Sequence, residues 1–315
     1  MDLLDCFRGC LLGGAVGDAL GMPTEGYTAE EIRSHFGPVR EMLAAPVGHF
    51  HTGLEAGQFT DDTEETLLLA ESLIEASGFS AERFAGKLIE WGTAWTLDER
   101  LNRGVGFTTH SSVESLIAGR SWQESGLSIP TCGSAMRASP IGLLFHSDIG
   151  LTGRYADLQS LPTHTASAAR AGSVAVATGV ALCLQGFPHE MILQTAAEKA
   201  RLIDRDFAEK LFSIESLLDL EPYEALKTIG TSPLASETVP AAFYCFLKLG
   251  PEEALMIAAG GGGDTDSIAS IAGSLFGAAC GPGWIPDRWL SLLEQKERIE
   301  AAARGLFDLQ TVLSR

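Results

Sequence analysis

The chain has 315 residues, of which 45% are hydrophobic and 20% charged; this composition supports a sizeable core and excludes a disordered protein. The formal net charge of −19 excludes nucleic acid and anionic membranes as partners, because a surface of that sign repels them. An anionic substrate would need a local positive centre in such a protein, and a bound cation can supply one.

Helical patterns run through the whole chain, and strand patterns are scarce. Residues 2–21 are mostly apolar and contain several glycines. Residues 62–77 open with acids and stop before Gly78, and residues 80–95 follow with a core stripe that includes Trp91 and Trp95. Further helices are predicted near 108–118, 132–144, 165–185, 188–202, 204–219, 222–228, 236–248, 251–259, 264–279 and 286–313.

Loops are predicted at the Pro- and Gly-rich positions 37–53, 230–233 and 281–286. No linker or repeat divides the chain. The sequence therefore predicts an all-α fold with about a dozen helices in one domain that spans residues 1–315.

Six cysteines occur without a Cys-x-x-Cys pair, which predicts reduced, buried thiols in a cytoplasmic protein. No basic-then-apolar segment opens the chain. The longest small-apolar run, Ala171 to Leu184, is too short and too rich in Ala, Ser, Gly and Thr to span a bilayer. We expect a buried helix there and no membrane partner.

Three oxygen-rich sites stand out in the sequence. One is the stretch from Gly17 to Glu25. The other two are clusters that stand where helices should begin, and their members are Thr60, Asp61, Asp62, Asp264, Asp266 and Ser267. A single Asp at a helix start is most often a cap. Adjacent acids gain less from capping, because the second repels the first. Mg²⁺ and similar hard cations prefer carboxylate and hydroxyl oxygens. The clusters could therefore hold two such ions if the helix starts meet.

The run Gly260–Gly263 comes directly before the second cluster. It leaves no side chain above the helix start, and glycine permits a turn that brings both aspartates to one point. The alternative is a tight helix–helix linker, which would not require Asp-x-Asp-Ser. An EF-hand is excluded because the twelfth position from Asp264 is Leu275. Gly263 leads into Asp-Thr-Asp, which fits neither Walker A nor a dinucleotide-binding fingerprint.

At these residues the sequence resembles the ADP-ribosylglycohydrolase family. The matching segments are RGCLLGGAVGDALGMPTE near the start, GQFTDDTEETLLLAESL, CGSAMRASPIGLLF at 132–145, THTASAARAGSVAVATGVAL at 163–182 and GGGGDTDSIASIAGSLFGA. The resemblance implies a compact, orthogonal multi-helix fold with two Mg²⁺ or Mn²⁺ ions in a central cleft. It also implies that all six cluster residues are metal ligands and that Asp266 bridges the ions.

The resemblance places Glu25, which follows Gly-Asp-Ala-Leu-Gly, near the metals and the scissile bond. We expect Glu25 or Asp62 to act as general base or to orient a water. Two residues depart from the family pattern. Cys132 stands where members commonly have the Asn of Gly-Asn-Gly, and Gly104 stands where the dinitrogenase-reductase type has a catalytic aspartate.

The ADP-ribose diphosphate is expected against backbone amides in two turns that precede helices. The predicted substrate-binding residues are Gly104, Val105, Gly106, Phe107, Cys132, Gly133, Ser134, Met136 and His164.

Several side chains keep two interpretations. His164 either lies near the ligand or only begins a helix. Phe107 either stacks on adenine or packs in the core, and Arg137 either contacts phosphate or forms a salt bridge. His49 and His51 form a His-x-His pair, but nothing nearby in the sequence completes a zinc site.

The predicted activity is hydrolysis of the bond between ADP-ribose and an acceptor on a modified protein, linked through arginine or serine, by a monomeric enzyme. One alternative is an enzyme of the same fold that acts on a small ADP-ribose derivative or another nucleoside glycoside. Another is a non-catalytic ADP-ribose-binding relative, which the intact acids argue against. A serine hydrolase is disfavoured because no G-x-S-x-G motif occurs.

Overall fold

The computed structural model describes residues 2–314, and every regular element in that range is a helix. Apart from these helices, only isolated β-bridges occur within it, such as the one that pairs Thr28 with Gly262. The all-α fold predicted from the sequence is therefore confirmed.

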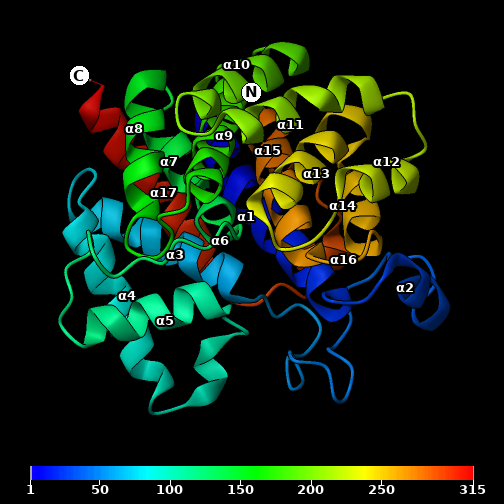
Figure 1. Cartoon of the computed structure of the whole chain (residues 1–315), viewed down its shortest axis with the longest axis horizontal. Coiled ribbons are helices and arrows are strands. Elements are labelled where there is room, and N and C mark those ends of the chain that lie inside the picture. Colours follow the sequence, from blue (N-terminus) through cyan, green and yellow to red (C-terminus); the bar gives the residue numbers. More distant parts are fainter. Residues whose placement is uncertain (1, 315) are drawn as a thin grey trace.

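Two helices from opposite ends of the chain form the centre of the molecule (Figure 1). They are α1 (Leu3–Gly21) and α15 (Thr265–Cys280), and both are almost entirely buried. The other helices surround this pair. In chain order they are η1 (Met22–Thr24), α2 (Ala29–His35), α3 (Asp61–Glu75), α4 (Ala81–Trp95), η2 (Glu99–Asn102), α5 (Phe107–Ile117), α6 (Gly133–Met136), α7 (Ser139–Leu144), α8 (Ile149–Ser160), α9 (Ser167–Leu184), α10 (His189–Arg201), α11 (Arg205–Ser213), η3 (Ile214–Leu217), α12 (Pro222–Ile229), α13 (Ala235–Lys248), α14 (Pro251–Gly260), η4 (Pro282–Trp284), α16 (Asp287–Leu290) and α17 (Lys296–Leu313).

Small residues let α1 and α15 pack with their backbones in direct contact. A Cβ atom added to Gly9 would lie 2.5 Å from the carbonyl oxygen of Gly277, and one added to Gly17 would lie 2.1 Å from that of Ala269. Residue numbers rise along one helix as they fall along the other, so the pair is antiparallel. The C-terminal end of α1 therefore lies beside the first turn of α15.

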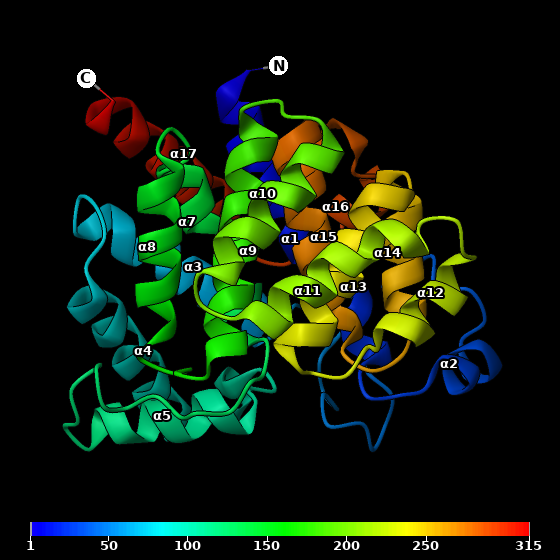
Figure 2. The same cartoon turned by 45° about the horizontal axis from the view of Figure 1, so that its top comes forward.

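The surrounding helices cover this pair from several sides. Helices α9, α13 and α14 pack on α15, and α17 packs on α1 and α3. Figure 2 shows α9 and α10 in front of the central pair. Helices α4 and α5 pack together at one edge of the molecule, where Trp91 and Trp95 are buried as predicted.

Within residues 2–314, α9 is the one helix long and apolar enough to cross a membrane, judged by length and composition. It is nevertheless a core helix, because 78% of it is buried inside the fold. The prediction of a buried helix in this stretch is confirmed. The cysteines follow their prediction with one exception, since all six are free but Cys280 is exposed.

Some predicted helices are divided in the structure. The expected helix 132–144 consists of α6 and α7. Pro140 stands in the first turn of α7, where its missing amide hydrogen costs no intrahelical hydrogen bond. The expected helix 286–313 is broken before Gln295, whose left-handed backbone begins α17. The segment 204–219 divides into α11 and η3, and α2 and α8 were not predicted.

Candidate active site

The α1–α15 contact places Glu25 beside the second acidic cluster. A Cβ atom on Gly21, the last residue of α1, would lie 2.5 Å from the backbone of Asp266. The chain then passes through η1 to Glu25, and the next amide, of Gly26, donates to the carbonyl oxygen of Gly263 at 2.7 Å. Glu25 and Asp266 are thus brought together by main-chain contacts.

The glycines before α15 make the predicted turn. Gly262 and Gly263 have φ angles of 81° and 73°, in the left-handed region that favours glycine. A Cβ atom on Gly263 would lie 2.0 Å from the carbonyl oxygen of Thr231. Space and backbone conformation both require glycine here, and the turn leads directly into Asp264.

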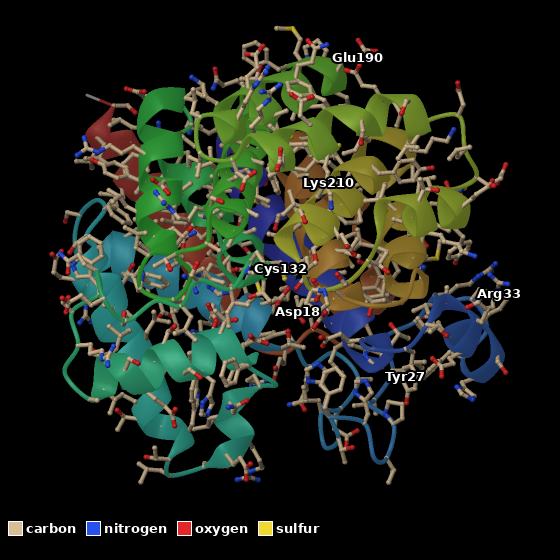
Figure 3. All side chains as sticks on the ribbon, viewed as in Figure 1. Asp18, Tyr27, Arg33, Cys132, Glu190 and Lys210 are labelled. Atoms are coloured by element: carbon tan, nitrogen blue, oxygen red, sulfur yellow. The ribbon has the colours of Figure 1, made fainter. Side chains whose placement is uncertain are left out.

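The first cluster is held by Asp18, a buried residue of α1 (Figure 3). Its carboxylate accepts hydrogen bonds from the backbone amides of Thr60 (2.9 Å) and Thr63 (3.0 Å) and from the Thr63 hydroxyl (2.5 Å). These amides belong to the first turn of α3, whose free donors attract a negative charge. Asp18 therefore fixes the start of α3 against α1.

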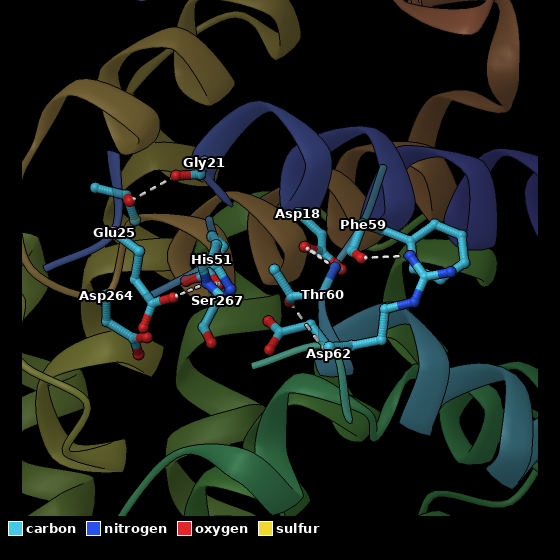
Figure 4. Close-up of polar contacts among 12 residues, drawn as sticks. Asp18, Gly21, Glu25, His51, Phe59, Thr60, Asp62, Asp264 and Ser267 are labelled. Carbon is cyan, nitrogen blue, oxygen red and sulfur yellow. Dashed lines mark hydrogen bonds and ion pairs between the residues drawn. The ribbon is translucent and has the colours of Figure 1, made fainter. Parts of the chain in front are cut away.

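The two acidic clusters meet at one end of the α1–α15 pair. Figure 4 shows Asp62 on one side of the site and Asp264 and Ser267 on the other. Between them lies a pocket of about 320 Å³. Its polar end is lined by Glu25, Asp61, Asp62, Asp264, Asp266 and Ser267. Within residues 2–314, no lysine or arginine is among the residues that line it.

The acidic end has an unbalanced negative charge. Burial raises the pKa values of Glu25, Asp61, Asp62 and Asp266 well above those of ordinary carboxyl groups, and neighbouring carboxylates raise them further. Asp62 Oδ2 is buried without a hydrogen-bond partner. Oxygen ligands gathered in this way, with no described lysine or arginine among the lining residues to neutralise them, fit a site for hard divalent cations.

Two histidines hold Glu25 from the long loop before α3. His51 Nε2 lies 2.6 Å from Glu25 Oε2 and 3.9 Å from Asp266 Oδ2, and His49 Nε2 lies 2.7 Å from the Glu25 carbonyl oxygen. Burial lowers the pKa of His51 to about 4, so its imidazole is neutral at physiological pH. One ligand atom each from Glu25, His51 and Asp266 lie within 4.8 Å of one another.

Asp264 is bound on the opposite side by neutral donors. The Thr238 hydroxyl donates to Asp264 Oδ2 at 2.5 Å, and the Cys132 thiol donates to the same oxygen at 3.1 Å. Cys132 Sγ also lies 3.6 Å from the Ser267 hydroxyl. Cys132 therefore lies between the acidic end of the pocket and the wall formed by α6.

The loop before α5 closes the pocket on another side. The amide of Asp61 donates to the carbonyl oxygen of Arg103 at 3.2 Å, which ties this loop to α3. A Cβ atom on Gly104 would lie 2.2 Å from the imidazole of His51. Because His51 occupies that space, residue 104 has no room for an aspartate side chain.

The comparisons with known proteins agree with this geometry. The sequence profile of the ADP-ribosylglycohydrolase family matches residues 1–314. The chain belongs to the ADP-ribosylglycohydrolase family. As a member, it is a glycosyl hydrolase that acts on linkages of ADP-ribose.

Several known proteins are similar to this chain over most of their length. An uncharacterized protein of Archaeoglobus fulgidus is 40% identical, and the match covers 96% of each chain. Human ADP-ribosylhydrolase ARH3 is 28% identical, with 96% of this chain and 93% of the human chain covered. The ADP-ribosylarginine hydrolase Tri1 of Serratia proteamaculans is 29% identical, with 96% and 79% covered. A solved structure named an ADP-ribosylglycohydrolase-related protein complex aligns with a TM-score of 0.72 at 28% identity, over 98% of this chain and 99% of that chain.

Most of the residues predicted for substrate binding line the pocket of this ADP-ribosylglycohydrolase; they are Gly104, Gly106, Phe107, Cys132, Gly133, Met136 and His164. Val105 and Ser134 do not line it. The Ser134 hydroxyl instead donates to the carbonyl oxygen of Ala169 at 3.2 Å, away from the pocket. Phe107 is 73% exposed, so the alternative that it packs in the core is wrong.

Two further residues of the ADP-ribosylglycohydrolase, Thr60 and Arg137, do not line the pocket. Thr60 is fully buried and does not line the pocket, and its hydroxyl accepts from the Asp62 amide as the N-cap of α3. Arg137 forms a salt bridge with Glu65, and both side chains are completely buried. Of its two interpretations, the salt bridge is therefore confirmed.

Sequence reasoning missed three residues at this site. Asp18 lies inside an apolar helix. A buried acid requires hydrogen-bond donors, so an aspartate in an apolar helical pattern was the signal in the sequence that could have identified it. His51 had no partner in its own segment, because Glu25 and Asp266 come from other parts of the chain. Thr238 lies in α13 without any motif to mark it.

Proposed function

We propose that this chain hydrolyses the glycosidic bond between the anomeric carbon of ADP-ribose and an acceptor on a modified protein, and that it requires two divalent cations, Mg²⁺ or Mn²⁺. The observation that carries the proposal is the meeting of the helix starts at 60–62 and 264–267 around an acidic pocket that no described lysine or arginine lines. Carboxylates gathered in this way are destabilising unless a cation neutralises them.

The cations would be held by Asp61, Asp62, Asp264, Asp266 and Ser267, with Thr60 supporting Asp62. When bound, they would lower the pKa of a water molecule and orient the ribose hydroxyls. The unpartnered Asp62 Oδ2 supports this assignment, since a buried carboxylate oxygen with no donor is otherwise costly.

Glu25 is the first candidate for the general base. His51 holds one of its oxygens at 2.6 Å, and the carboxylate lines the pocket beside Asp266. Burial raises the pKa of Glu25 well above that of an ordinary glutamate, which favours proton uptake nearer neutral pH. Asp62 is the second candidate for orienting the attacking water, because its free oxygen lies on the facing side of the site.

The remaining walls suit the other parts of ADP-ribose. The backbone amides at the start of α6 and in the 104–106 loop are available to the diphosphate. Phe107 presents an exposed ring at the rim of the pocket, where adenine can stack on it. A relative named for arginine and one whose name gives no linkage match almost equally well, so the comparisons do not favour arginine over the serine linkage that the sequence analysis also named.

The test is a panel of arginine-linked, serine-linked and small-molecule-linked ADP-ribose, assayed with Mg²⁺, with EDTA and after Mg²⁺ is restored. We expect release of ADP-ribose from a protein adduct, reversible loss in EDTA, and loss in Asp266→Ala. The matched control is Asp308→Asn, which changes an exposed carboxylate of α17 and should leave the rate unchanged. Full activity in EDTA would contradict the cation requirement, and turnover of small molecules alone would contradict a protein substrate.

A further inference from the structure

A chain of buried polar side chains leads from the Arg137–Glu65 salt bridge to the pocket wall. Arg137 Nη2 donates to Thr163 Oγ1 at 2.7 Å, and Thr163 Oγ1 lies 2.8 Å from His164 Nδ1. His164 Nε2 lies 3.0 Å from Thr131 Oγ1. None of these contacts involves the acidic end of the pocket.

The chain ends at two threonines that line the pocket. Thr131 Oγ1 lies 3.1 Å from Thr108 Oγ1, at the first turn of α5. Within residues 2–314, no further acceptor is found for either hydroxyl. What this wall offers to a ligand therefore depends on the direction in which the hydrogen bonds run.

The direction is fixed at the Arg137 end. Arginine only donates, so Thr163 Oγ1 must accept from it. The single Thr163 proton can then go to His164 Nδ1 at 2.8 Å or to the Ser160 carbonyl oxygen at 3.4 Å. Hydroxyl donors bond at about 2.5–3.0 Å, which favours the histidine.

His164 continues the hydrogen bonds in the same direction, since it accepts at one ring nitrogen and donates from the other. Burial, together with the charge of Arg137, lowers the pKa of His164 to about 3, so the ring is neutral. A neutral imidazole that accepts at Nδ1 carries its proton on Nε2 and donates to Thr131. Thr131 and Thr108 then hold two hydroxyl protons but share one hydrogen bond, so one proton is left for the pocket.

The reverse direction would give a different wall. If His164 carried its proton on Nδ1, then Nε2 would accept from Thr131, and Thr131 would accept from Thr108. Both hydroxyl protons would be used, and only acceptors would face the ligand. The salt bridge therefore decides whether this wall donates or accepts.

We propose that Arg137 and Thr163 act as positioning residues that hold His164 as its Nε2–H tautomer, so that the Thr108–Thr131 pair keeps one hydroxyl proton to donate to a phosphate group of the ligand. Phosphate oxygens only accept hydrogen bonds, which matches a wall that offers a hydroxyl proton. The identity of the ligand as ADP-ribose rests on the proposed function, whereas the direction of the hydrogen bonds from Arg137 to Thr131 does not.

The first experiment reads the tautomer directly. Nitrogen-15 NMR of the Mg²⁺-loaded protein should show His164 as the neutral Nε2–H form near pH 7. Thr163→Val removes the hydroxyl without touching the pocket and should release the tautomer, whereas Thr163→Ser should retain it. An Nδ1–H ring in the wild-type protein would overturn the inference.

The second experiment measures binding of ADP-ribose, ADP and adenosine, since only the first two carry a diphosphate. We expect Thr163→Val to weaken both diphosphates about tenfold and leave adenosine unchanged, as befits a lost hydrogen bond to a charged group. Thr163→Ser should bind as the wild type. The double substitution Thr108→Val/Thr131→Val should lose diphosphate affinity, because no hydroxyl proton then remains at this wall. In turnover, Thr163→Val should raise KM with kcat nearly unchanged.

The outcomes separate this inference from the proposed function. Equal weakening of all three ligands would show a merely structural role for Thr163 and overturn the inference, as would unchanged affinity for the diphosphates. A protein that binds ADP in the predicted Thr163-dependent way but never cleaves ADP-ribosyl bonds would overturn the proposed function and support the phosphate-binding wall. Binding of neither diphosphate would overturn both.

Discussion

Asp62 combines full burial, an oxygen without a partner and several carboxylate neighbours. Such a residue destabilises the folded protein until a cation binds, so activity and stability conflict at this position. Asp18 differs, because the amides and hydroxyl at the start of α3 bind its carboxylate. We therefore expect substitution of Asp62 to stabilise the cation-free protein and substitution of Asp18 to destabilise it, although both residues are buried.

We expect Asp62→Asn to raise the melting temperature of the protein in EDTA by a few degrees and to abolish hydrolysis. The amide removes a buried charge and can donate to neighbouring carboxylates. Mg²⁺ should stabilise the wild type much more than the variant. Thermal unfolding with and without Mg²⁺ checks this, with Asp308→Asn as control. A variant less stable than the wild type in EDTA would contradict the account.

The advantage of Asp62→Asn over the wild type in EDTA should depend on pH. Burial and neighbouring charges raise the pKa of Asp62, so the folded wild type holds a proton that the unfolded chain loses near pH 4. The stabilisation that this proton gives to the folded wild type is complete at low pH and is lost as the pH rises through the pKa of Asp62 in the folded protein. The difference in unfolding free energy should therefore grow from about pH 4 upward and then level off. Buried histidines are present in both proteins and cancel. A difference that shrinks with rising pH would contradict the raised pKa.

Among the helices, the α1–α15 pair does most to position the site. Its contact is backbone against backbone, so even one methyl group has no room. Overpacking in a closed interface typically costs about 1–3 kcal/mol or more. A glycine-to-alanine substitution in a helix that has space for the methyl group should instead stabilise the protein, because alanine restricts the unfolded chain.

Gly17→Ala should destabilise the protein by at least about 2 kcal/mol, since the new Cβ would lie 2.1 Å from a carbonyl oxygen of α15. Gly86→Ala in α4 is the matched control. Its Cβ would meet only the end of the Arg83 side chain at 3.5 Å, and we expect a gain of up to about 1 kcal/mol. Urea unfolding measures both. Equal effects of the two substitutions would contradict the tight contact.

The long helices were predictable because their apolar periodicity matches the burial they have in the fold. The short ones depended on local chemistry. The Thr28-x-x-Glu31 capping box indicates the start of α2, and Pro140 indicates the break before α7. Both patterns can be read in the sequence. The left-handed Gln295 had no comparable signal, because tertiary contacts around the preceding residue set its conformation.

The acidic clusters of the site were predictable because each stands at a helix start with a distinctive spacing. Their neighbours were not. His51 and Thr238 acquire roles only through long-range packing, and nothing in their own segments marks them. The direction of the Arg137 chain also needs coordinates, since it depends on two distances from one hydroxyl.

At the scale of the whole molecule, the net charge of −19 opposes the approach of an anionic ligand. With Mg²⁺ saturating, kcat/KM for ADP-ribose on an acidic peptide should rise about two- to threefold between about 20 and 150 mM salt, because screening weakens the repulsion. The same adduct on a lysine-rich peptide should show the opposite trend. Steady-state kinetics over this range check the prediction, and identical trends for both peptides would contradict it.

The backbone contact between α1 and α15 has a consequence for protein engineering. The spacing of Glu25 and Asp266 is set by main-chain atoms that the glycines of α1 allow into direct contact with α15. The segments around residues 104–107 and 129–133 lie outside that contact. We expect exchange of these segments to change which adduct is admitted while the spacing of Glu25 and Asp266 is kept, provided that Gly104 and Cys132, which contact His51 and Asp264, are retained.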